Sequence, residues 1–517
     1  MMRVLLYDGG YETFAVQYLL ANLRQHGHEA LLFFDNSFVV DYLAQDFPFQ
    51  ELFSLSCAQV AEDILAQRPQ VVGFSMFTMF YQRYLGIIRA LKARQPELMI
   101  IAGGFQPTLL GERVLASANQ VDFILLGESE LSLPPLLQAL ETHGRDGCLT
   151  LAAAALPGVW NRAPGEGGGL VQRGFSPIPQ ELDEIPFPVK ELHYGYNPRL
   201  AQIYTVIASR GCPYVCTYCN SATMNKVYRG ARARYYRVRS VDNVIAELRQ
   251  AKERFRPRQV MFFDDVFAGQ RDWLVEFAVK YRQEIDLPYY CQTSPLIHDA
   301  DSVRLLAESG CVQLEFGFQS ANAQVRKEVL ARTETNDGMA LLLREANGRG
   351  IFTELDLIAN LPGETEAHLE ESLEFIIATR PKWVNLSYLQ FHPHTPITAT
   401  AIQTGLLGSE DVERIQEGRH TTSMRLVAKS NLGRRHRVLP FQIFAAFVFP
   451  AGLARRTIRW LDRPLVGAIA ARFASFFLYF SRILHSYLDR RDFLVRHHVV
   501  RSMTAMRWIV TRKVFGP

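Results

Sequence analysis

Three cysteines lie close together near the middle of the chain, in the stretch SRGCPYVCTYCN at residues 209–220. Cys212, Cys216 and Cys219 follow one another at spacings of four and three, after an apolar, β-branched run at residues 203–208. A strand that leads into a short loop can bring three thiolates to one spot. A zinc site or a cluster held by protein alone needs a fourth ligand, and no further Cys or His follows at ligand spacing. The pattern predicts an iron–sulfur cluster with one open corner; zinc or chance clustering is the alternative.

The spacing C-x-x-x-C-x-x-C after a strand resembles the signature of the radical S-adenosylmethionine superfamily. The resemblance implies a [4Fe–4S] cluster on the three cysteines, whose open iron chelates the amino and carboxylate groups of S-adenosylmethionine. One electron then cleaves that molecule to a 5′-deoxyadenosyl radical, which requires a low-potential donor such as flavodoxin or ferredoxin. Tyr218, directly before the third cysteine, matches the aromatic residue that packs by the cluster and the adenine.

Length and composition set the frame for that chemistry. The 517 residues suffice for two or three domains, and 48% hydrophobic with 21% charged residues is ordinary for a soluble globular protein. Seven cysteines without a paired framework argue against a secreted disulfide scaffold. The chain opens on a strand pattern, so no signal peptide is expected. We expect a cytoplasmic protein, peripheral to the inner face of the membrane if the C-terminal region contacts lipid.

The first third of the chain, residues 1–143, alternates strand and helix patterns. This alternation predicts a doubly wound, Rossmann-like parallel sheet that is covered on both faces. Strands are expected at 3–7, 28–34, 71–76, 99–104 and 123–127, and helices at 84–94 and 132–142.

Glycine-bearing turns follow several of these strands, at the edge where such sheets bind ligands. Taken alone they are sharp strand–helix turns. Beside the cysteine motif, the domain resembles the cobalamin-binding module found upstream in one subgroup of the superfamily. That resemblance implies cobalamin contacts from Asp8, Gly9, Gly103, Gly104, Gln106, Thr108, Gly127 and Glu128. The Asp-x-His-x-x-Gly motif is absent and Gln106 stands where many relatives have His, so we expect cobalamin without a histidine on its lower face.

Residues 144–198 form a Pro- and Gly-rich linker, with a small hairpin expected near 156–173. Residues 199–400 resume longer strand–helix units, which fit the partial (β/α)6 barrel that the superfamily shares. Strands are expected at 204–209, 260–264, 289–293, 312–318, 352–358 and 383–390, with helices between them.

Polar residues at the ends of these strands are the candidate S-adenosylmethionine contacts. One carboxylate of Asp264 and Asp265 is expected to accept hydrogen bonds from the ammonium group, with a helix N-terminal pair as the alternative. Gln319 and Ser320 resemble the family's Gly-x-Glu-Ser turn, which contacts the ribose or the methionyl portion. The pair His392 and His394 fits a surface turn better than a metal site.

The C-terminal region, residues 401–517, is basic and mostly helical by pattern. After Met424 the acids are Asp462, Asp489 and Asp492, whereas arginine recurs between apolar runs at 441–453 and 465–479. The arginines named for this region are Arg434, Arg435, Arg437, Arg455, Arg456, Arg459, Arg463, Arg490 and Arg491. Neither apolar run can span a bilayer. We expect contact with an anionic membrane surface or a lipid-like substrate, or helices that cap the barrel; no nucleic acid is expected.

These observations favour a cobalamin-dependent radical S-adenosylmethionine enzyme that methylates an unactivated carbon of a small or lipid-like substrate. An oxidoreductase or cyclase on the same scaffold, of the tetrapyrrole- or hopanoid-modifying type, is the enzymatic alternative. A metal-sensing or scaffold protein is the non-enzymatic one.

Overall fold

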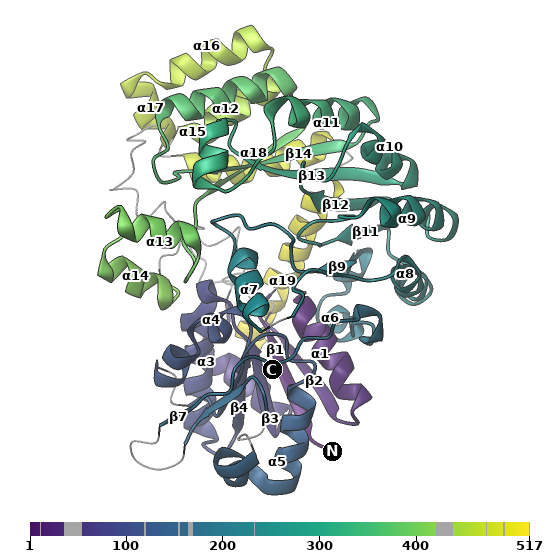
Figure 1. Ribbon diagram of the computed structural model, residues 1–517, viewed down its shortest axis with the longest axis vertical. Coiled ribbons are helices and arrows are strands. Elements are labelled where there is room, and N and C mark those ends of the chain that lie inside the picture. The colour runs from purple at the N-terminus through teal and green to yellow at the C-terminus, as the bar shows by residue number, and fades with distance from the viewer. Residues whose placement is uncertain are drawn as a thin grey trace.

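The computed structural model describes residues 1–10, 12–35, 54–117, 120–152, 156–163, 169–231, 233–419, 438–471, 473–489 and 492–515. Two α/β units lie one above the other, and helices from the last fifth of the chain pack on the upper unit and return to the lower one (Figure 1). The mixed α/β fold class expected from the sequence is confirmed.

The lower unit is a seven-stranded sheet in the order β2-β1-β3-β4-β5-β6-β7. Its first five strands are parallel: β1 (Arg3–Asp8), β2 (Glu29–Phe34), β3 (Val71–Ser75), β4 (Met99–Gly103) and β5 (Phe123–Leu125). Helices cover it: α1 (Phe14–Gln25), α2 (Cys57–Ala66), α3 (Tyr81–Arg94), α4 (Phe105–Ser117) and α5 (Leu133–Gly147). Two apolar cores, one on each face, explain why the buried strands read as continuous hydrophobic runs.

The hairpin expected in the linker belongs to this sheet. Strands β6 (Val159–Arg162) and β7 (Leu170–Val171) pair antiparallel and extend the sheet beyond β5. The sheet therefore continues past residue 143. The connector that follows is packed against the rest of the protein, because Ile178, Leu182 and Val189 are buried. It ends in α6 (Glu191–Tyr196).

The upper unit is an open barrel of six parallel strands in the order β8-β11-β12-β13-β14-β15. The strands are β8 (Ile203–Val206), β11 (Gln259–Phe262), β12 (Tyr289–Thr293), β13 (Cys311–Gln319), β14 (Phe352–Ala359) and β15 (Trp383–Tyr388). The helices that cover it are α8 (Val241–Phe255), α9 (Arg271–Glu284), α10 (Ala300–Ser309), α11 (Asn336–Gly348) and α12 (Glu366–Thr379). A short antiparallel pair, β9 (Ser209–Arg210) with β10 (Arg237–Val238), flanks the end of β8.

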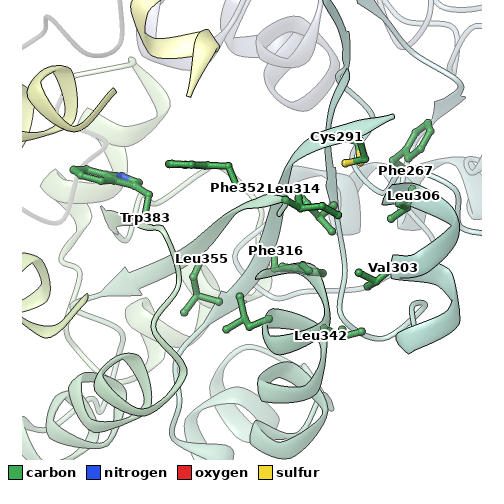
Figure 2. Packing of buried hydrophobic residues seen from close by; sticks show 14 of the residues in the cluster. Phe267, Cys291, Val303, Leu306, Leu314, Phe316, Leu342, Phe352, Leu355 and Trp383 are labelled. Atoms are coloured by element: carbon green, nitrogen blue, oxygen red, sulfur yellow. The ribbon is translucent and has the colours of Figure 1, made fainter. Parts of the chain in front are cut away.

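Alternation along the barrel strands separates an apolar outer face from a polar interior. On β13, Leu314 and Phe316 pack outward against the surrounding helices (Figure 2). Between them Glu315 faces the interior, where its Oε2 accepts a 2.6 Å hydrogen bond from the Tyr290 hydroxyl. Asp356 on the neighbouring strand is in hydrogen-bond contact with Glu315. The barrel interior can therefore receive a polar group.

The remaining helices close the barrel and tie the two units together. α15 buries Ile443 and Phe447 in the barrel core. From α18, Arg482 reaches Glu354 at 2.8 Å, and on α19 Ile509 is fully buried in the core of the lower unit. The helices of this region are α13 (Pro396–Gln403), α14 (Ser409–Gln416), α15 (Leu439–Val448), α16 (Ala451–Leu461), α17 (Pro464–Ala471), α18 (Ala474–Leu488) and α19 (Phe493–Phe515).

Part of the predicted basic region cannot be compared with the structure. Arg434, Arg435, Arg437, Arg490 and Arg491 lie outside the described residues. Among the residues that are described, no helix has both the length and the apolar character needed to cross a bilayer.

Candidate functional site

The three cysteines lie in the loop between β9 and α7 (Asn220–Gly230). Gly211 opens this loop at φ +77°, and a Cβ there would come within 2.6 Å of the Tyr235 carbonyl oxygen, so the position requires glycine. Thr217 ties the loop to the barrel, because its Oγ1 donates to the Val329 carbonyl at 2.5 Å. Cys219 forms the N-cap of α7, and its Sγ accepts from the Ser221 backbone N–H. These contacts hold the cysteine loop in a defined conformation.

All three cysteine thiols are free of disulfides. Burial raises the pKa of Cys212 to about 12 and also raises the pKa of Cys219, so these thiols give up their protons only to a strongly binding cation. In the described ranges, no three His, Cys, Asp or Glu side chains converge closely enough to hold a single metal ion. Sulfurs that share one zinc ion lie within about 4 Å of each other.

Arg332 reaches the cysteine loop from the segment after β13. Its Nη1 lies 3.5 Å from Cys216 Sγ and 3.4 Å from the Tyr218 hydroxyl. The guanidinium is held by Glu334, at 2.5 Å from Nε, and by the Gly317 carbonyl, at 2.6 Å from Nη2. The sequence analysis missed Arg332, since nothing in the flanking residues marks it as a neighbour of the motif. It is the fixed positive charge beside the candidate cluster.

The two aspartates after β11 have different surroundings. Asp264 is 1% exposed and accepts from the Ala208 N–H at 3.0 Å and from Ser209 Oγ at 2.5 Å. Burial raises its pKa to about 7. Asp264 therefore holds the end of β8 in place, and contact of one of the two carboxylates with S-adenosylmethionine stays a prediction. Asp265 is exposed to a cavity and accepts from Ser221 Oγ at 2.9 Å, beside the cysteine loop.

Gln319 and Ser320 lie at the end of β13 but are both buried. The register of β13 on β14 shifts between Gly317 and Gln319, and Gln319 has φ +73°. This bulge turns the Gln319 side chain toward a small void beside α12. Ser320 accepts from the Asn322 N–H at 3.3 Å, and its carbonyl accepts from Arg326. Contact of Gln319 and Ser320 with S-adenosylmethionine stays a prediction.

A cavity of about 360 Å³ separates the two α/β units. Its barrel side includes Arg210, Tyr228, Phe263 and Asp265, and its other side is the strand-end edge of the lower sheet. It continues inward along an apolar wall between the sheet and helices α1 and α5. The residues of that wall include Val4, Leu6, Val16, Leu19, Val71 and Leu133. Of the expected cobalamin contacts, the lining contains Gly103, Gly104, Thr108, Gly127 and Glu128.

Asp8, Gly9 and Gln106 are not among the lining residues. Asp8 is buried and accepts from Thr13 Oγ1 at 2.5 Å and from His193 Nε2 at 2.8 Å, so it fastens α6 to the sheet. Gln106 is fully buried and donates to the Gln416 carbonyl at 2.8 Å, which docks α14 on α4. In this structure both side chains hold neighbouring elements together, and their contact with cobalamin stays a prediction.

The glycines that line the cavity differ in whether the fold requires them. A Cβ on Gly104, at φ +93°, would come within 2.8 Å of the Met76 nitrogen, and one on Gly127 would meet the Tyr228 hydroxyl at 2.2 Å. Both positions therefore need glycine for the fold itself. A Cβ on Gly103 would meet only ordinary contacts at 3.6 Å. The packing of the chain itself therefore does not require glycine at that position.

Glu128 is engaged across the boundary between the units. Its carboxylate pairs with Arg210, at 2.7 Å, and with Arg237. Burial alone would raise the pKa of Glu128, but the two arginines outweigh it and lower the pKa. Arg210 also pairs with Glu130 at 2.7 Å. The Gly-Glu turn thus anchors the segment that leads into the cysteine loop as well as lining the cavity.

Two family models match the chain in the places where these features lie. The B12 binding domain matches residues 4–137, and the Radical SAM superfamily matches residues 206–376. The chain belongs to the radical S-adenosylmethionine enzymes that carry a B12-binding domain. Its cofactors are accordingly a [4Fe–4S] cluster, S-adenosylmethionine and cobalamin, and it is an enzyme rather than a metal sensor or scaffold.

Relatives of this radical S-adenosylmethionine enzyme are distant. The chain is 24% identical over 368 residues to the uncharacterized methyltransferase PH0819 of Pyrococcus horikoshii. The alignment covers 70% of this chain and 73% of PH0819. It is 23% identical over 383 residues to the anaerobic magnesium-protoporphyrin IX monomethyl ester cyclase of Rubrivivax gelatinosus. That alignment covers 73% of this chain but 64% of the cyclase, slightly less than two thirds.

A solved structure shares the fold over nearly the whole chain. The cobalamin-dependent S-adenosylmethionine radical enzyme OxsB, with aqua-cobalamin and S-adenosylmethionine bound, matches with a TM-score of 0.65 and 14% identity. The match covers 99% of this chain and 79% of OxsB. At this identity the likeness establishes the arrangement of both domains, not the reaction.

Proposed function

We propose that this enzyme is a cobalamin-dependent methyltransferase that transfers a methyl group to an unactivated carbon of a small or lipid-like substrate. The observation that carries the proposal is that a cavity between the two units is lined by residues of both. The turns of the B12-binding domain line one side of it, and Arg210, Gly211 and Asp265, next to the cysteine loop, line the other. A methyl donor and a radical source that share one space can act on one substrate.

Cys212, Cys216 and Cys219 would hold the cluster, with Tyr218 and Asp265 beside S-adenosylmethionine. Bound together, the cofactors supply a carbon radical from S-adenosylmethionine and a transferable methyl group on cobalamin. The chain's own contribution is to position them and to exclude water. The Thr217 hydrogen bond holds the cysteine loop on the barrel unit, and the ion pairs of Arg210 join that unit to the B12-binding domain. Together these contacts would fix the spacing between the cluster site and the cobalamin site.

The cavity also fits cobalamin by the chemistry of its walls. Gly103 leaves backbone open to a close-lying ring, and the apolar wall along Leu6 and Val71 can take the aromatic dimethylbenzimidazole base at the end of the cobalamin tail. None of the described lining residues is a histidine. This supports the proposal that cobalamin binds without a histidine on its lower face.

The substrate would enter the barrel interior, where its polar groups can meet Tyr290, Glu315 and Asp356. Burial raises the pKa of Asp356 to about 6, and burial together with the charge of Asp356 raises that of Glu315 well above its usual range. The pair therefore keeps a shared proton near neutral pH and can donate as well as accept a hydrogen bond. Polarity in the interior supports a substrate with a hydroxyl, carbonyl or amine near its reacting carbon.

A radical cyclase or oxidoreductase is the second candidate, favoured by the likeness to the magnesium-protoporphyrin cyclase. The methyltransferase name of PH0819 supports methyl transfer over cyclisation or oxidation.

Two partners complete the proposal. A low-potential protein such as flavodoxin or ferredoxin would supply electrons, and the basic C-terminal region would contact a lipid surface.

The test is anaerobic reconstitution with iron, sulfide and hydroxocobalamin, followed by incubation of S-adenosylmethionine with a strong reductant. We expect 5′-deoxyadenosine from the wild type and none from Cys212→Ala, Cys216→Ala or Cys219→Ala, which should also lose the visible thiolate-to-iron absorption. The matched control is Cys57→Ala on α2, which lies outside the loop and should leave both signals intact.

The product mass then separates the candidates. A metabolite that accumulates in a deletion strain should gain one methylene unit when incubated with the enzyme. A loss of hydrogen or a new ring without that gain would contradict methyl transfer and favour the cyclase reading. Full turnover by any one of the three cysteine variants would contradict the cluster assignment itself.

A further inference from the structure

Helices α16 and α17 present an apolar surface to solvent. Trp460 is 51% exposed, Leu465 76% and Ile469 56%, and Leu453 and Phe473 are also largely exposed. The two helices lie at the end of the molecule farthest from α5 and the N-terminal sheet (Figure 1). Large apolar side chains gathered at one end of a protein mark an interaction surface more often than chance exposure.

Arginines are interleaved with these apolar residues. Arg456, Arg459 and Arg463 are exposed, and among the described residues none of them has an acidic partner. Their neighbour Arg455 differs, because it pairs with Glu374 of α12 at 2.7 Å. The one acid between them, Asp462, accepts a 2.7 Å hydrogen bond from Gln442. The surface is therefore positively charged as well as apolar.

The orientation of this surface is fixed by the opposite side of α16. Ala454, Ile458 and Leu461 follow at spacings of four and three and are buried. Arg456 and Trp460, four residues apart, share a solvent-facing side of the helix. Since α16 is already packed and pinned to α12 through Arg455, little conformational freedom remains to be lost on binding. The exposed side is a preformed face.

We infer that this face, which we call the α16–α17 surface, binds the anionic surface of a lipid bilayer. Helices with Lys or Arg beside Trp, Phe and Leu lie in the interface with the apolar groups inserted and the cations at the headgroups. The described helices do not include one that could span a bilayer. The inference rests on the lipid contact proposed above for the basic C-terminal region and assigns it to this surface. It does not depend on the reaction, because the surface contains no residue of the cofactor cavity.

The test is co-sedimentation of the full-length protein with vesicles of phosphatidylcholine alone or with about 30% phosphatidylglycerol. Each arginine near an anionic surface contributes roughly fivefold to partitioning. The variant Arg456→Gln/Arg459→Gln/Arg463→Gln should therefore bind anionic vesicles on the order of a hundredfold more weakly. Trp460→Ser/Leu465→Ser should lose the part of binding that persists at high salt, since burial of apolar groups is not screened.

The matched control is Val279→Ser/Arg282→Gln on α9, which removes an equally exposed apolar residue and arginine from another face. It should bind vesicles like the wild type, and every variant should still form 5′-deoxyadenosine. The inference is overturned if the wild-type protein stays in solution with anionic vesicles at low salt, or if the triple variant sediments unchanged. Tighter arginine-dependent binding to single-stranded RNA than to vesicles would overturn it in favour of a nucleic-acid surface.

Discussion

Arg332 is the residue whose position has the most direct bearing on the cofactor chemistry. It places a positive charge and an N–H donor at one of the three candidate ligands, Cys216. Hydrogen bonds and positive charge at cluster sulfurs stabilise the reduced cluster, which carries more negative charge. Glu334 and the Gly317 carbonyl fix the guanidinium in that position, so the interaction is built into the fold.

Replacing Arg332 by Met should therefore make the cluster harder to reduce. We expect the midpoint potential, followed by electron paramagnetic resonance during a redox titration, to shift to a more negative value. Arg332→Lys, which keeps the charge but loses the fork of donors, should give an intermediate shift. Arg344→Met on the exposed side of α11 is the control, with an unchanged potential. A wild-type potential in Arg332→Met protein of full iron content would refute this role.

Individual residues show how far sequence reasoning reaches. The cysteines could be predicted as a set because their spacing is short and local, and the loop keeps them together. Asp264, Gln106 and Asp8 are polar residues at strand ends, yet each is buried and hydrogen-bonded to another element. A strand end accommodates both ligand contacts and element-to-element contacts. Sequence alone does not say which partner a polar residue will meet across the fold.

At the scale of elements, the turn between β14 and α12 combines a glycine and a buried carboxyl. Gly363 has φ +75°, and Glu364 Oε2 accepts from the backbone N–H groups of Asn360, at 2.7 Å, and Leu361, at 3.2 Å. Burial raises the pKa of Glu364 from 4.5 to about 7. The carboxyl thus shapes the loop at the end of a barrel strand, and in the folded protein it keeps its proton to a higher pH than an exposed glutamate does.

This raised pKa gives a pH dependence with a definite sign. Between pH 4.5 and about 7 the folded protein holds the Glu364 proton while the unfolded chain releases it. The contribution of this carboxyl to stability therefore falls as pH rises through that window, and it is constant above it. Glu364→Gln cannot ionise and keeps an oxygen for both N–H groups.

Thermal unfolding should show the melting temperature of Glu364→Gln gaining on the wild type as pH rises from about 5 to about 7.5. Glu366→Gln, two residues away on the exposed first turn of α12, is the matched control and should show no such trend. If the difference in melting temperature between Glu364→Gln and the wild type stays constant, or shifts in favour of the wild type as pH rises, the carboxyl is already ionised at low pH.

Regular elements could be predicted where the hydrophobic period is strong. The strands of both sheets appear within a few residues of their expected positions, since fully buried parallel strands give unbroken apolar runs. α7 was missed because its sequence, NSATMNKVYRG, has no clear apolar stripe and depends on Cys219 and the barrel for its start. The sequence predicts β6 and β7 as a hairpin but does not predict that they join the first sheet. Their pairing with β5 is a long-range contact that local patterns do not encode.

For the molecule as a whole, Arg210 is the contact that joins the two α/β units at the cavity. From the segment before the cysteine loop it pairs with Glu128 and Glu130, and its guanidinium stacks 4.7 Å from the Tyr18 ring centroid. Arg237 reinforces the contact with Glu128. All of these groups are largely buried, so the interface depends on the charges being paired.

Replacing Arg210 by Met should leave Glu130 buried without its cation and cost about 3–5 kcal/mol of interface stability. In calorimetry of the cofactor-free protein, we expect one unfolding transition of the wild type to separate into two. Arg249→Met, which breaks an exposed ion pair with Glu284 within the barrel unit, should change stability by less than about 1 kcal/mol. A single transition at the wild-type temperature in Arg210→Met would show that the connector and α19 hold the units together without this pair.

The return of α19 to the first sheet matters for the order in which the protein is made. Ile509 fills a site in the core of the N-terminal domain, which leaves the ribosome first, whereas α19 leaves it last. At about 5–20 residues per second, the roughly 360 residues between α5 and Ile509 take about 20–70 seconds to synthesise. Throughout that time the nascent domain keeps an apolar gap. We expect chaperones to occupy it, and chains released before α19 to be degraded.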